Sequence, residues 1–249
     1  MKKNLCLLLF WMGTTFLLTA QNQSKEVSSV LAVNFSYSTH IAAGDLADRF
    51  GLHFKAGGGV DYLLKNNWSL GVDAGFIFGN RVDEDIFSTI SPNGEFIGNS
   101  RLLADVQLRH RGFYLGGSVG KIIPLVDTNP HSGIRATIGL GLWQHRIRIQ
   151  QDPQAFVPQV ADSYAEGYDR LTNGLAITEF IGYQYMSNNR LVNFFFGVEM
   201  TQGFTKNRRD FNFDQRQRDD QSRTDLQFGF RLGWILPFYL GERAEDIFY

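Results

Sequence analysis

The segment LQFGFRLGWILPF places an apolar side chain at every even-numbered position from Leu226 to Phe238. Successive side chains of a β-strand point to opposite faces, so this period of two predicts a strand with one wholly apolar face. The odd-numbered positions include Gln227, Arg231 and two glycines. What the chain can fold into depends on which of these two faces meets the solvent.

The same alternation recurs in VLAVNFSYSTH, FGLHFKAGGGVDYLL and WSLGVDAGFIF. Their apolar faces carry aromatic residues at the segment ends, and their polar faces combine a few charges with small residues and glycine. A soluble β-sandwich also alternates, but a water-facing surface is usually longer and more charged. Small side chains suit the interior of a narrow barrel. We therefore predict an all-β protein folded as an antiparallel up-and-down transmembrane β-barrel.

The connections between these segments set the number of strands. Three are long and polar, near 81–103, 150–172 and 206–222, whereas Lys65–Asn67 and Ser187–Asn189 are short. Bacterial single-chain barrels have an even number of strands, with long loops outside and short turns in the periplasm. This division predicts eight strands, near 29–41, 51–64, 68–80, 104–124, 133–149, 173–186, 190–205 and 223–240.

An alternative division splits the fourth predicted strand at RHRG, Arg109–Gly112, as a tight turn. It gives nine strands and places a short turn on the outer side and long loops on the periplasmic side. Because bacterial single-chain barrels have an even number of strands, we do not favour this division. We instead predict a bulge at His110–Gly112, after which Phe113, Leu115 and Val119 form the lipid-facing side.

The first 20 residues place two lysines ahead of an apolar run from Leu5 to Leu18, with Ala20 behind it. This pattern predicts a secretory signal peptide that is removed before Gln21, because the run is shorter than the ~20 residues of a membrane-spanning helix. The mature barrel domain would then be residues 21–249, and its expected location is the outer membrane of a Gram-negative bacterium.

Composition excludes several classes of function. The single cysteine, Cys6, lies in the predicted leader, so the mature chain has no disulfide, thiol nucleophile or thiolate metal site. Without Lys2 and Lys3, the 24 basic residues fall to 22 against 25 acidic ones, a formal charge of −3, which does not favour nucleic acid. His145 has no second histidine or carboxylate spaced to hold a metal. We expect no cofactor and no metal.

The phrases GYDRLTNGLA, GYQYMSNNRLVNFFFG and TQGFTKNRRDFNFD look like those in barrel proteins of Bacteroidota. With its leader, eight strands and three long loops, nearly the whole mature chain resembles the small outer-membrane barrels of the OmpA and OmpX type. That resemblance implies a location among outer-membrane lipids and lipopolysaccharide. Most such relatives lack an assigned activity, and some small Bacteroidota barrels are accessory subunits of outer-membrane machines such as the type IX secretion system. No motif ties this chain to that system.

Polar residues on the inward faces are the first candidate site. The interior of an eight-stranded barrel is just wide enough for side chains to fill it. These residues could form a proton or ion path, or a structural network in which every charge is paired, because an unpaired buried charge costs several kcal/mol. We expect the network. Its predicted members are His53, Lys55, Asp61, Asp73, Glu199, Gln227 and Arg231.

A second candidate is similar to the lipid A deacylases, outer-membrane barrels with a His-x-Ser-Asn motif and a glutamate twelve residues after the serine. Ser187 and Asn188 match the Ser-Asn pair and Glu199 matches the glutamate, but Tyr185 stands where the histidine should be. A hydroxyl nucleophile needs a base, and tyrosine, with a pKa of about 10, is a poor one. Ser-Asn-Asn is also a good turn sequence. The turn is the favoured interpretation.

The last long loop mixes arginines and aspartates. Arginine forks suit lipopolysaccharide phosphates or the carboxylates of a partner, and the aspartates could bind calcium that bridges phosphates. The alternative is a solvated loop whose charges pair with each other, which is the commoner outcome. The binding candidates are Arg208, Arg209, Asp210, Arg216 and Arg218.

The loop near 150–172 contains more apolar residues than a fully solvent-exposed loop usually does. Its apolar residues either fold over the mouth of the barrel or form a patch that docks a partner, and the sequence does not separate the two. They are Phe156, Val157, Val160, Tyr164 and Tyr168.

Together these features predict a non-enzymatic barrel that acts through its extracellular loops as an interaction or accessory subunit, within a larger outer-membrane complex such as a secretion system. Two alternatives stay open, a lipid A deacylase-like hydrolase and a narrow channel.

Overall fold

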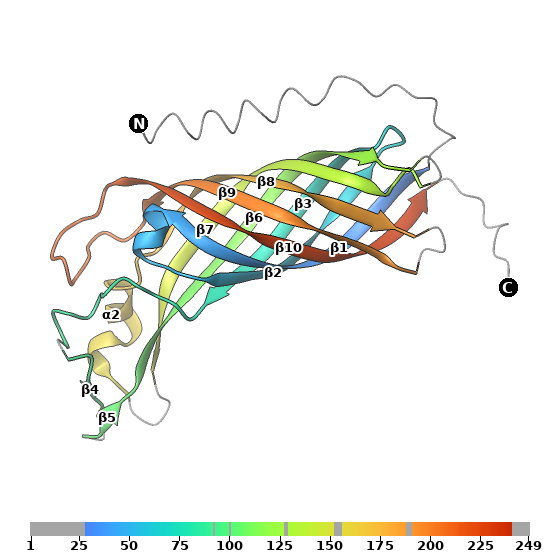
Figure 1. Cartoon of the computed structure of the whole chain (residues 1–249). Helices are drawn as coiled ribbons and strands as arrows, with labels where there is room; N and C mark the ends of the chain where they lie inside the picture. The colour runs from blue at the N-terminus through green and yellow to red at the C-terminus, as the bar shows by residue number, and fades with distance from the viewer. Residues whose placement is uncertain are drawn as a thin grey trace.

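The computed structural model describes residues 28–91, 93–99, 101–126, 129–151, 156–187 and 191–240. Eight strands close into one antiparallel barrel in the order β1-β10-β9-β8-β7-β6-β3-β2 (Figure 1). Each barrel strand pairs with the next one in the chain, and β1 pairs with β10 to close the sheet. The predicted all-β, eight-stranded up-and-down barrel is confirmed. The strands are β1 (Ser29–Gly44), β2 (His53–Leu63), β3 (Trp68–Gly79), β6 (Val106–Pro124), β7 (Gly133–Gln151), β8 (Thr172–Met186), β9 (Asn193–Asn207) and β10 (Ser222–Leu240).

Long and short connections lie at opposite ends of the barrel, as predicted. At one end, the loop end, lie loop 1 (45–52), loop 2 (80–105), loop 3 (152–171) and loop 4 (208–221). The other end, the turn end, has short connections, together with the first residue of β1 and the last of β10, which pair with each other. The loops contain the small elements η1 (Asp45–Asp48), β4 (Phe96–Ile97), β5 (Leu103–Ala104), η2 (Pro158–Val160) and α2 (Asp162–Glu166).

The outer wall of the barrel is apolar. On β10 the even-numbered side chains point outward, with Phe230 73% exposed, whereas Asp225 and Ile235 point inward and are buried. On β7 the outward side chains are apolar from Ile134 to Leu142, about 27 Å along the strand. With the usual strand tilt this is close to the ~25 Å apolar band of a membrane barrel. The sheet is therefore turned inside out relative to a soluble protein, as the period-two pattern predicted.

The predicted bulge at His110–Gly112 is wrong. β6 pairs with β7 without interruption from Val106 to Pro124, and with β3 from His110 to Lys121. Odd-numbered side chains of β6 point outward throughout, so Arg109 and Arg111 share the outer face with Phe113. No bulge is needed because the two arginines lie beyond the apolar band, where the outer wall becomes polar.

Glycine inside the barrel makes room for one large side chain. A Cβ at Gly116 would lie 2.3 Å from the Tyr114 hydroxyl, and one at Gly141 would lie 2.8 Å from the Tyr114 ring. The buried Tyr114 ring therefore occupies space that a side chain at position 116 or 141 would fill. This accounts for part of the glycine on the inward faces.

Some predictions fall outside the described residues. The predicted leader, residues 1–20, and Asn188 belong to this part of the chain. Within the described ranges, no helix is long and apolar enough to cross a membrane.

Candidate functional site

Glu199 lies at the centre of the barrel interior and is fully buried. Its carboxylate meets three cationic or potentially cationic groups from three strands: Lys55 of β2, Arg231 of β10 and His40 of β1. The Nε2 atom of His40 is 3.0 Å from Glu199 Oε1, and Arg231 donates to Oε2 at 3.1 Å. Arg231 also donates to Asp73 of β3 at 2.8 Å. A charge network thus joins strands on opposite sides of the barrel.

A second ion pair lies nearer the turn end. Arg135 of β7 donates to Asp61 of β2 at 2.9 Å and to Gln184 of β8 at 3.1 Å. The Asn34 amide of β1 donates to the same carboxylate at 3.0 Å. Asp61 is therefore held by groups from two other strands, as a buried carboxylate requires.

An aromatic layer closes the interior at the loop end. The ring of Phe50, from loop 1, stacks on His110 at a centroid distance of 3.8 Å, and His110 meets His53 edge to face at 4.8 Å. His53 is also 2.8 Å from the Gln227 amide oxygen, and His145 is 2.9 Å from Asp225. All the residues predicted to point inward therefore lie inside the barrel, in contact with partners from other strands.

The interior leaves little free space. A cavity of about 20 Å³ lies beside Lys55, Asp73, Tyr114 and Arg231. One water needs roughly 10–15 Å³, so the cavity has room for about one water. The geometry is that of a filled, paired network, which weighs against a channel.

The structure does not bring together the residues of the hydrolase hypothesis. Glu199 pairs with Phe180 of β8, and Ser187 lies seven positions further along at the turn end, about 23 Å away. The Ser187 amide donates to Val192 O and Asn193 Oδ1, as in a turn. Tyr185 packs against Phe194 with centroids 5.5 Å apart. A serine and a glutamate at this separation cannot act on one bond.

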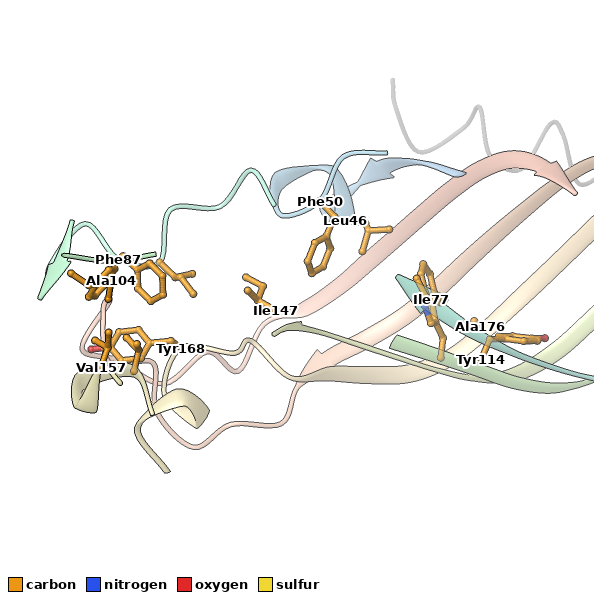
Figure 2. Packing of buried hydrophobic residues seen from close by; sticks show 14 residues of the cluster. Leu46, Phe50, Ile77, Phe87, Ala104, Tyr114, Ile147, Val157, Tyr168 and Ala176 are labelled. Carbon is orange, nitrogen blue, oxygen red and sulfur yellow. The ribbon is translucent and has the colours of Figure 1, made fainter. Parts of the chain in front are cut away.

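The four loops fold into one body above the barrel, which we call the cap. Phe87 and Phe96 of loop 2 meet edge to face at 5.0 Å, and Tyr168 of loop 3 packs on Phe87 at 6.1 Å. Val157 and Val160 of loop 3 are buried in the same cluster. In Figure 2 the labelled residues Phe87, Ala104, Val157 and Tyr168 lie beyond the barrel, and Leu46 and Phe50 of loop 1 lie between them and the strands. The buried apolar residues of loop 3 therefore belong to the cap, while Phe156 and Tyr164 stay exposed.

Two buried arginines tie the four loops together. The Arg170 side chain of loop 3 donates to Glu84 of loop 2 at 2.8 Å and to Asp214 of loop 4 at 2.5 Å. Arg49 of loop 1 pairs with Glu84 at 3.1 Å and with Asp219 of loop 4 at 3.5 Å. Sequence analysis missed both arginines, because their partners come from other loops and no spacing in the chain marks them.

Electrostatics within the cap stabilise its charged forms. Hydrogen bonds to Asp169 raise the pKa of the Arg209 guanidinium. Burial alone would raise the pKa of the Asp219 carboxyl, but the hydrogen bond and charge of Arg223 outweigh it and hold that pKa below its usual value. Arg223 donates to Asp219 at 2.7 Å.

The binding candidates of loop 4 divide into two groups. Arg209 points into the cap, where its guanidinium bonds Asp169 at 2.8 and 2.5 Å. Arg208, Asp210, Arg216 and Arg218 are exposed. Of these, Arg208 donates to Asn173 at 2.6 Å, and Arg218 lies 3.5 Å from Asp210. Much of the charge in this loop pairs within the protein, and no group of three or more His, Cys, Asp or Glu side chains in the described chain is placed to hold a metal.

An apolar patch lies at the outermost point of the cap. It belongs to the β4–β5 hairpin, which projects farthest from the barrel (Figure 1). Leu102 and Leu103 are 67% and 69% exposed, and Ile97 is similarly exposed. Phe156 lies beside them, since its carbonyl accepts a hydrogen bond from the Asn99 amide at 2.9 Å. We call Ile97, Leu102, Leu103 and Phe156 the hairpin patch.

One acidic residue interrupts the apolar outer wall. Its neighbours Thr178 and Phe180 on β8 point inward, so Glu179 points outward, between Ile138 of β7 and Met200 of β9. Ile138 lies midway along the apolar stretch of β7. Among the described residues, Glu179 makes no ion pair within 4.0 Å.

Comparison with solved structures finds small bacterial surface barrels. The chain is similar to Neisserial surface protein A, with 11% identity, a TM-score of 0.46, and coverage of 84% of this chain and 97% of that one. It is similar to Ail, the attachment invasion locus protein of Yersinia pestis, with 9% identity, a TM-score of 0.41 and coverage of 84% and 99%. The N-terminal β-barrel domain of Pseudomonas aeruginosa OprF shows 12% identity, a TM-score of 0.37 and coverage of 86% and 99%. No protein-family model matches the chain, and no curated protein matches it. The likeness concerns the fold alone, and the strand pairing of this chain establishes the barrel.

Proposed function

We propose that this protein is a non-enzymatic outer-membrane barrel, exported through its leader, that acts as an interaction or accessory subunit of a larger outer-membrane complex. In this proposal the loop end faces the outside and the turn end faces the periplasm. A secretion system is one such complex, because some small Bacteroidota barrels, which the sequence resembles, are accessory subunits of that kind of machine.

Placement in a membrane is supported by the surface of the barrel. Its outer wall is a band of exposed aliphatic and aromatic side chains on all eight strands. In water such a band would be a very large exposed apolar patch, whereas in lipid it is the stable arrangement. Closure of the sheet leaves no unpaired strand edge within that band.

The observation that carries the subunit role is the folded cap with its exposed hairpin patch. Buried arginines and an apolar cluster order the four loops over a filled barrel. This ordering holds Leu102 and Leu103 in water at the outermost point of the protein. Exposed leucines at an ordered position are typical of a surface that a protein partner covers.

Glu179 supports a contact within the membrane as well. An ionisable residue facing lipid is costly, and such residues usually meet a polar partner. A cationic or hydrogen-bonding group from a neighbouring membrane protein would supply that partner. The outer wall beside β8 is therefore a second place where a subunit of the complex would bind.

Purification from native outer membranes in mild detergent tests the proposal, with a tag after Tyr249. We expect a stoichiometric protein partner, and we expect the Leu102→Asn/Leu103→Asn variant to recover at least tenfold less of it. The matched control is Phe211→Asn, another exposed apolar residue of the cap outside the hairpin patch.

Glu179→Leu tests the contact within the membrane separately. It should reduce co-purification while leaving the isolated barrel as stable as before or more so, because it removes a carboxylate from lipid. A lone barrel from native membranes, or full partner recovery by the hairpin variant, would overturn the role of the cap.

A further inference from the structure

Four arginines cluster on the outer wall at the rim of the barrel. Arg109 and Arg111 are on β6, and they pair in register with Arg148 and Arg146 of β7. All four side chains point outward, because the residues between them, such as His110 and Ile147, are buried inside. Two directly opposed arginine pairs therefore stack on one face of a two-stranded ribbon.

This arrangement is unfavourable without an anion. Like charges directly opposite each other in a sheet destabilise it. Among the described residues, no carboxylate lies within 4.0 Å of Arg109, Arg111 or Arg148. The buried Nε atom of Arg109 has no hydrogen-bond partner. Arg146 is half exposed, and its carboxylate neighbour, Asp169 at 3.9 Å, is shared with Arg209.

The position of the cluster is equally informative. One step towards the turn end on β6, the outward residue is Phe113, followed by Leu115, both exposed. On β7, Gln144 separates Arg146 from Leu142, which begins the apolar stretch. The arginines therefore lie directly above the apolar band on a wall that faces sideways along the membrane.

The surroundings of the cluster are mostly basic or neutral. Arg208 and Lys206 continue the outward rim on the far side of Asn173, and both are exposed. Asp105, the acidic neighbour on the ribbon, accepts a hydrogen bond from Gln107, which in turn accepts one from Arg109 at 2.5 Å. This indirect contact and the Asp169 carboxylate that Arg146 shares with Arg209 leave most of the cationic charge of the cluster unbalanced.

We propose that the arginines Arg109, Arg111, Arg146 and Arg148 form a binding site for the phosphate groups of a phosphorylated glycolipid of the outer leaflet. Guanidinium groups bind phosphate through paired charge-assisted hydrogen bonds. The headgroup phosphates would lie between the two arginine rows, and the acyl chains would lie along Phe113, Leu115 and Leu142 below. This inference rests on the proposed outer-membrane location, but it does not require the protein partner of the cap.

The lipid is favoured over an acidic protein because the site combines cations with an apolar wall immediately beneath them. A soluble phosphate or an acidic peptide would bind the arginines but would make no contact with the apolar wall. Arg216 and Arg218 differ in this respect, since they are exposed in loop 4, beyond the ends of the barrel strands.

Binding of bisphosphorylated lipid A to the purified barrel in zwitterionic detergent tests the site. The variant is Arg109→Gln/Arg148→Gln, and the matched control is Arg216→Gln/Arg218→Gln, which removes the same charge from loop 4. Heat-dependent migration on a gel verifies that each variant is folded. We expect the variant to bind at least tenfold more weakly, because it loses the charge-assisted hydrogen bonds of one opposed arginine pair. The control should stay within twofold of the wild type, because its arginines lie outside the site.

Three other probes identify what the site recognises. Dephosphorylated lipid A should bind at least tenfold more weakly than the bisphosphorylated form, and inorganic phosphate and an acidic peptide should not compete at millimolar concentration. Equal binding by the variant and the wild type, equal binding of the dephosphorylated lipid, or full competition by phosphate or peptide would each overturn the proposal. Those results would leave the co-purification experiment unaffected, so failure of this site is distinguishable from failure of the subunit role.

Discussion

Individual charged residues show how the barrel interior is stabilised. Glu199 accepts from Arg231 and Lys55 and lies within 3.0 Å of His40, so one carboxylate joins side chains from three other strands. A buried ion pair contributes little over an apolar core of equal shape, but removing one member leaves a charge without compensation. The role of Glu199 is therefore tested by removing its charge alone and with its partners.

Glu199→Gln should destabilise the barrel by roughly 3–5 kcal/mol, because Lys55 and Arg231 then stay buried with a smaller counter-charge. Urea unfolding of the reconstituted protein measures this free energy. Asp220→Asn, at an exposed position in loop 4, serves as the control and should change it by less than about 0.5 kcal/mol. The quadruple variant Glu199→Leu/Lys55→Met/Arg231→Leu/Asp73→Asn, which also removes the charge of the second partner of Arg231, should recover most of the loss. A Glu199→Gln protein of wild-type stability would contradict the assignment.

At the scale of elements, the loops are ordered by contacts with each other. Loop 3 supplies Arg170 and an apolar face, loop 2 supplies Glu84 and two phenylalanines, and loop 4 supplies Asp214. Each loop by itself has little regular structure: α2, the one α-helix in the described residues, has 5 residues. The cap therefore gains its order cooperatively, and removing one shared residue should affect loops other than its own.

Arg170→Met keeps the length of the side chain but removes its bonds to Glu84 and Asp214. We expect amide hydrogen exchange in loops 2, 3 and 4 to increase at least tenfold, because Asp214 loses its ion-pair partner and Glu84 keeps only Arg49. Exchange in the barrel strands should be unchanged. Arg216→Met is the control, since Arg216 is exposed. Exchange that increases in loop 3 alone would show that the cap does not form one unit.

The cap should also loosen in acid. The pKa of Asp219 is lowered in the folded protein from its usual value of 3.8, so the stabilisation is fully present above about pH 4 and is lost as the pH falls through the folded pKa. Amide protection in the cap, referred to intrinsic exchange at each pH, should be constant from pH 7 to pH 5 and fall below pH 4.

Asp219→Asn isolates this contribution from that of the other cap carboxylates. Its protection should already be reduced at pH 7, because Arg49 and Arg223 lose a charged partner, and it should fall less steeply in acid. If the variant followed the wild-type profile throughout, Asp219 would not be the responsible group.

At the scale of the whole molecule, the barrel and the cap have separate roles. The interior is occupied by paired charges and an aromatic layer, with a cavity of about 20 Å³. The outer wall carries the apolar band, and the loop end carries the hairpin patch and the arginine cluster. The surfaces proposed to bind a protein partner or a lipid are therefore on the outside of the protein.

The filled interior predicts that the purified protein does not conduct ions. In planar bilayers, conductance should stay at the level of a protein-free membrane, at a protein density where a general porin reconstituted in the same way gives clear openings. Reproducible unitary openings would support the channel hypothesis and would require the charge network to move.

The sequence by itself determined the barrel, its strand number and, outside the first part of β6, which face of each strand is apolar. These features depend on a period of two within each strand and on the lengths of the connections, and both are local properties of the chain. The bulge predicted at His110–Gly112 does not form. The prediction assumed that the outward face of β6 is apolar along its whole length, whereas Arg109 and Arg111 point outward beyond the apolar band.

Only the tertiary structure decided the cap and the arginine cluster. Arg170 meets Glu84 across 86 positions of sequence, and no pattern links residues of different loops. Arg109 and Arg148 become neighbours through the register of β6 and β7, which is set by the closed sheet. Local periodicity is encoded in one segment, whereas these contacts depend on how several segments are held together, and so the surfaces that carry the proposed interactions became visible only in the fold.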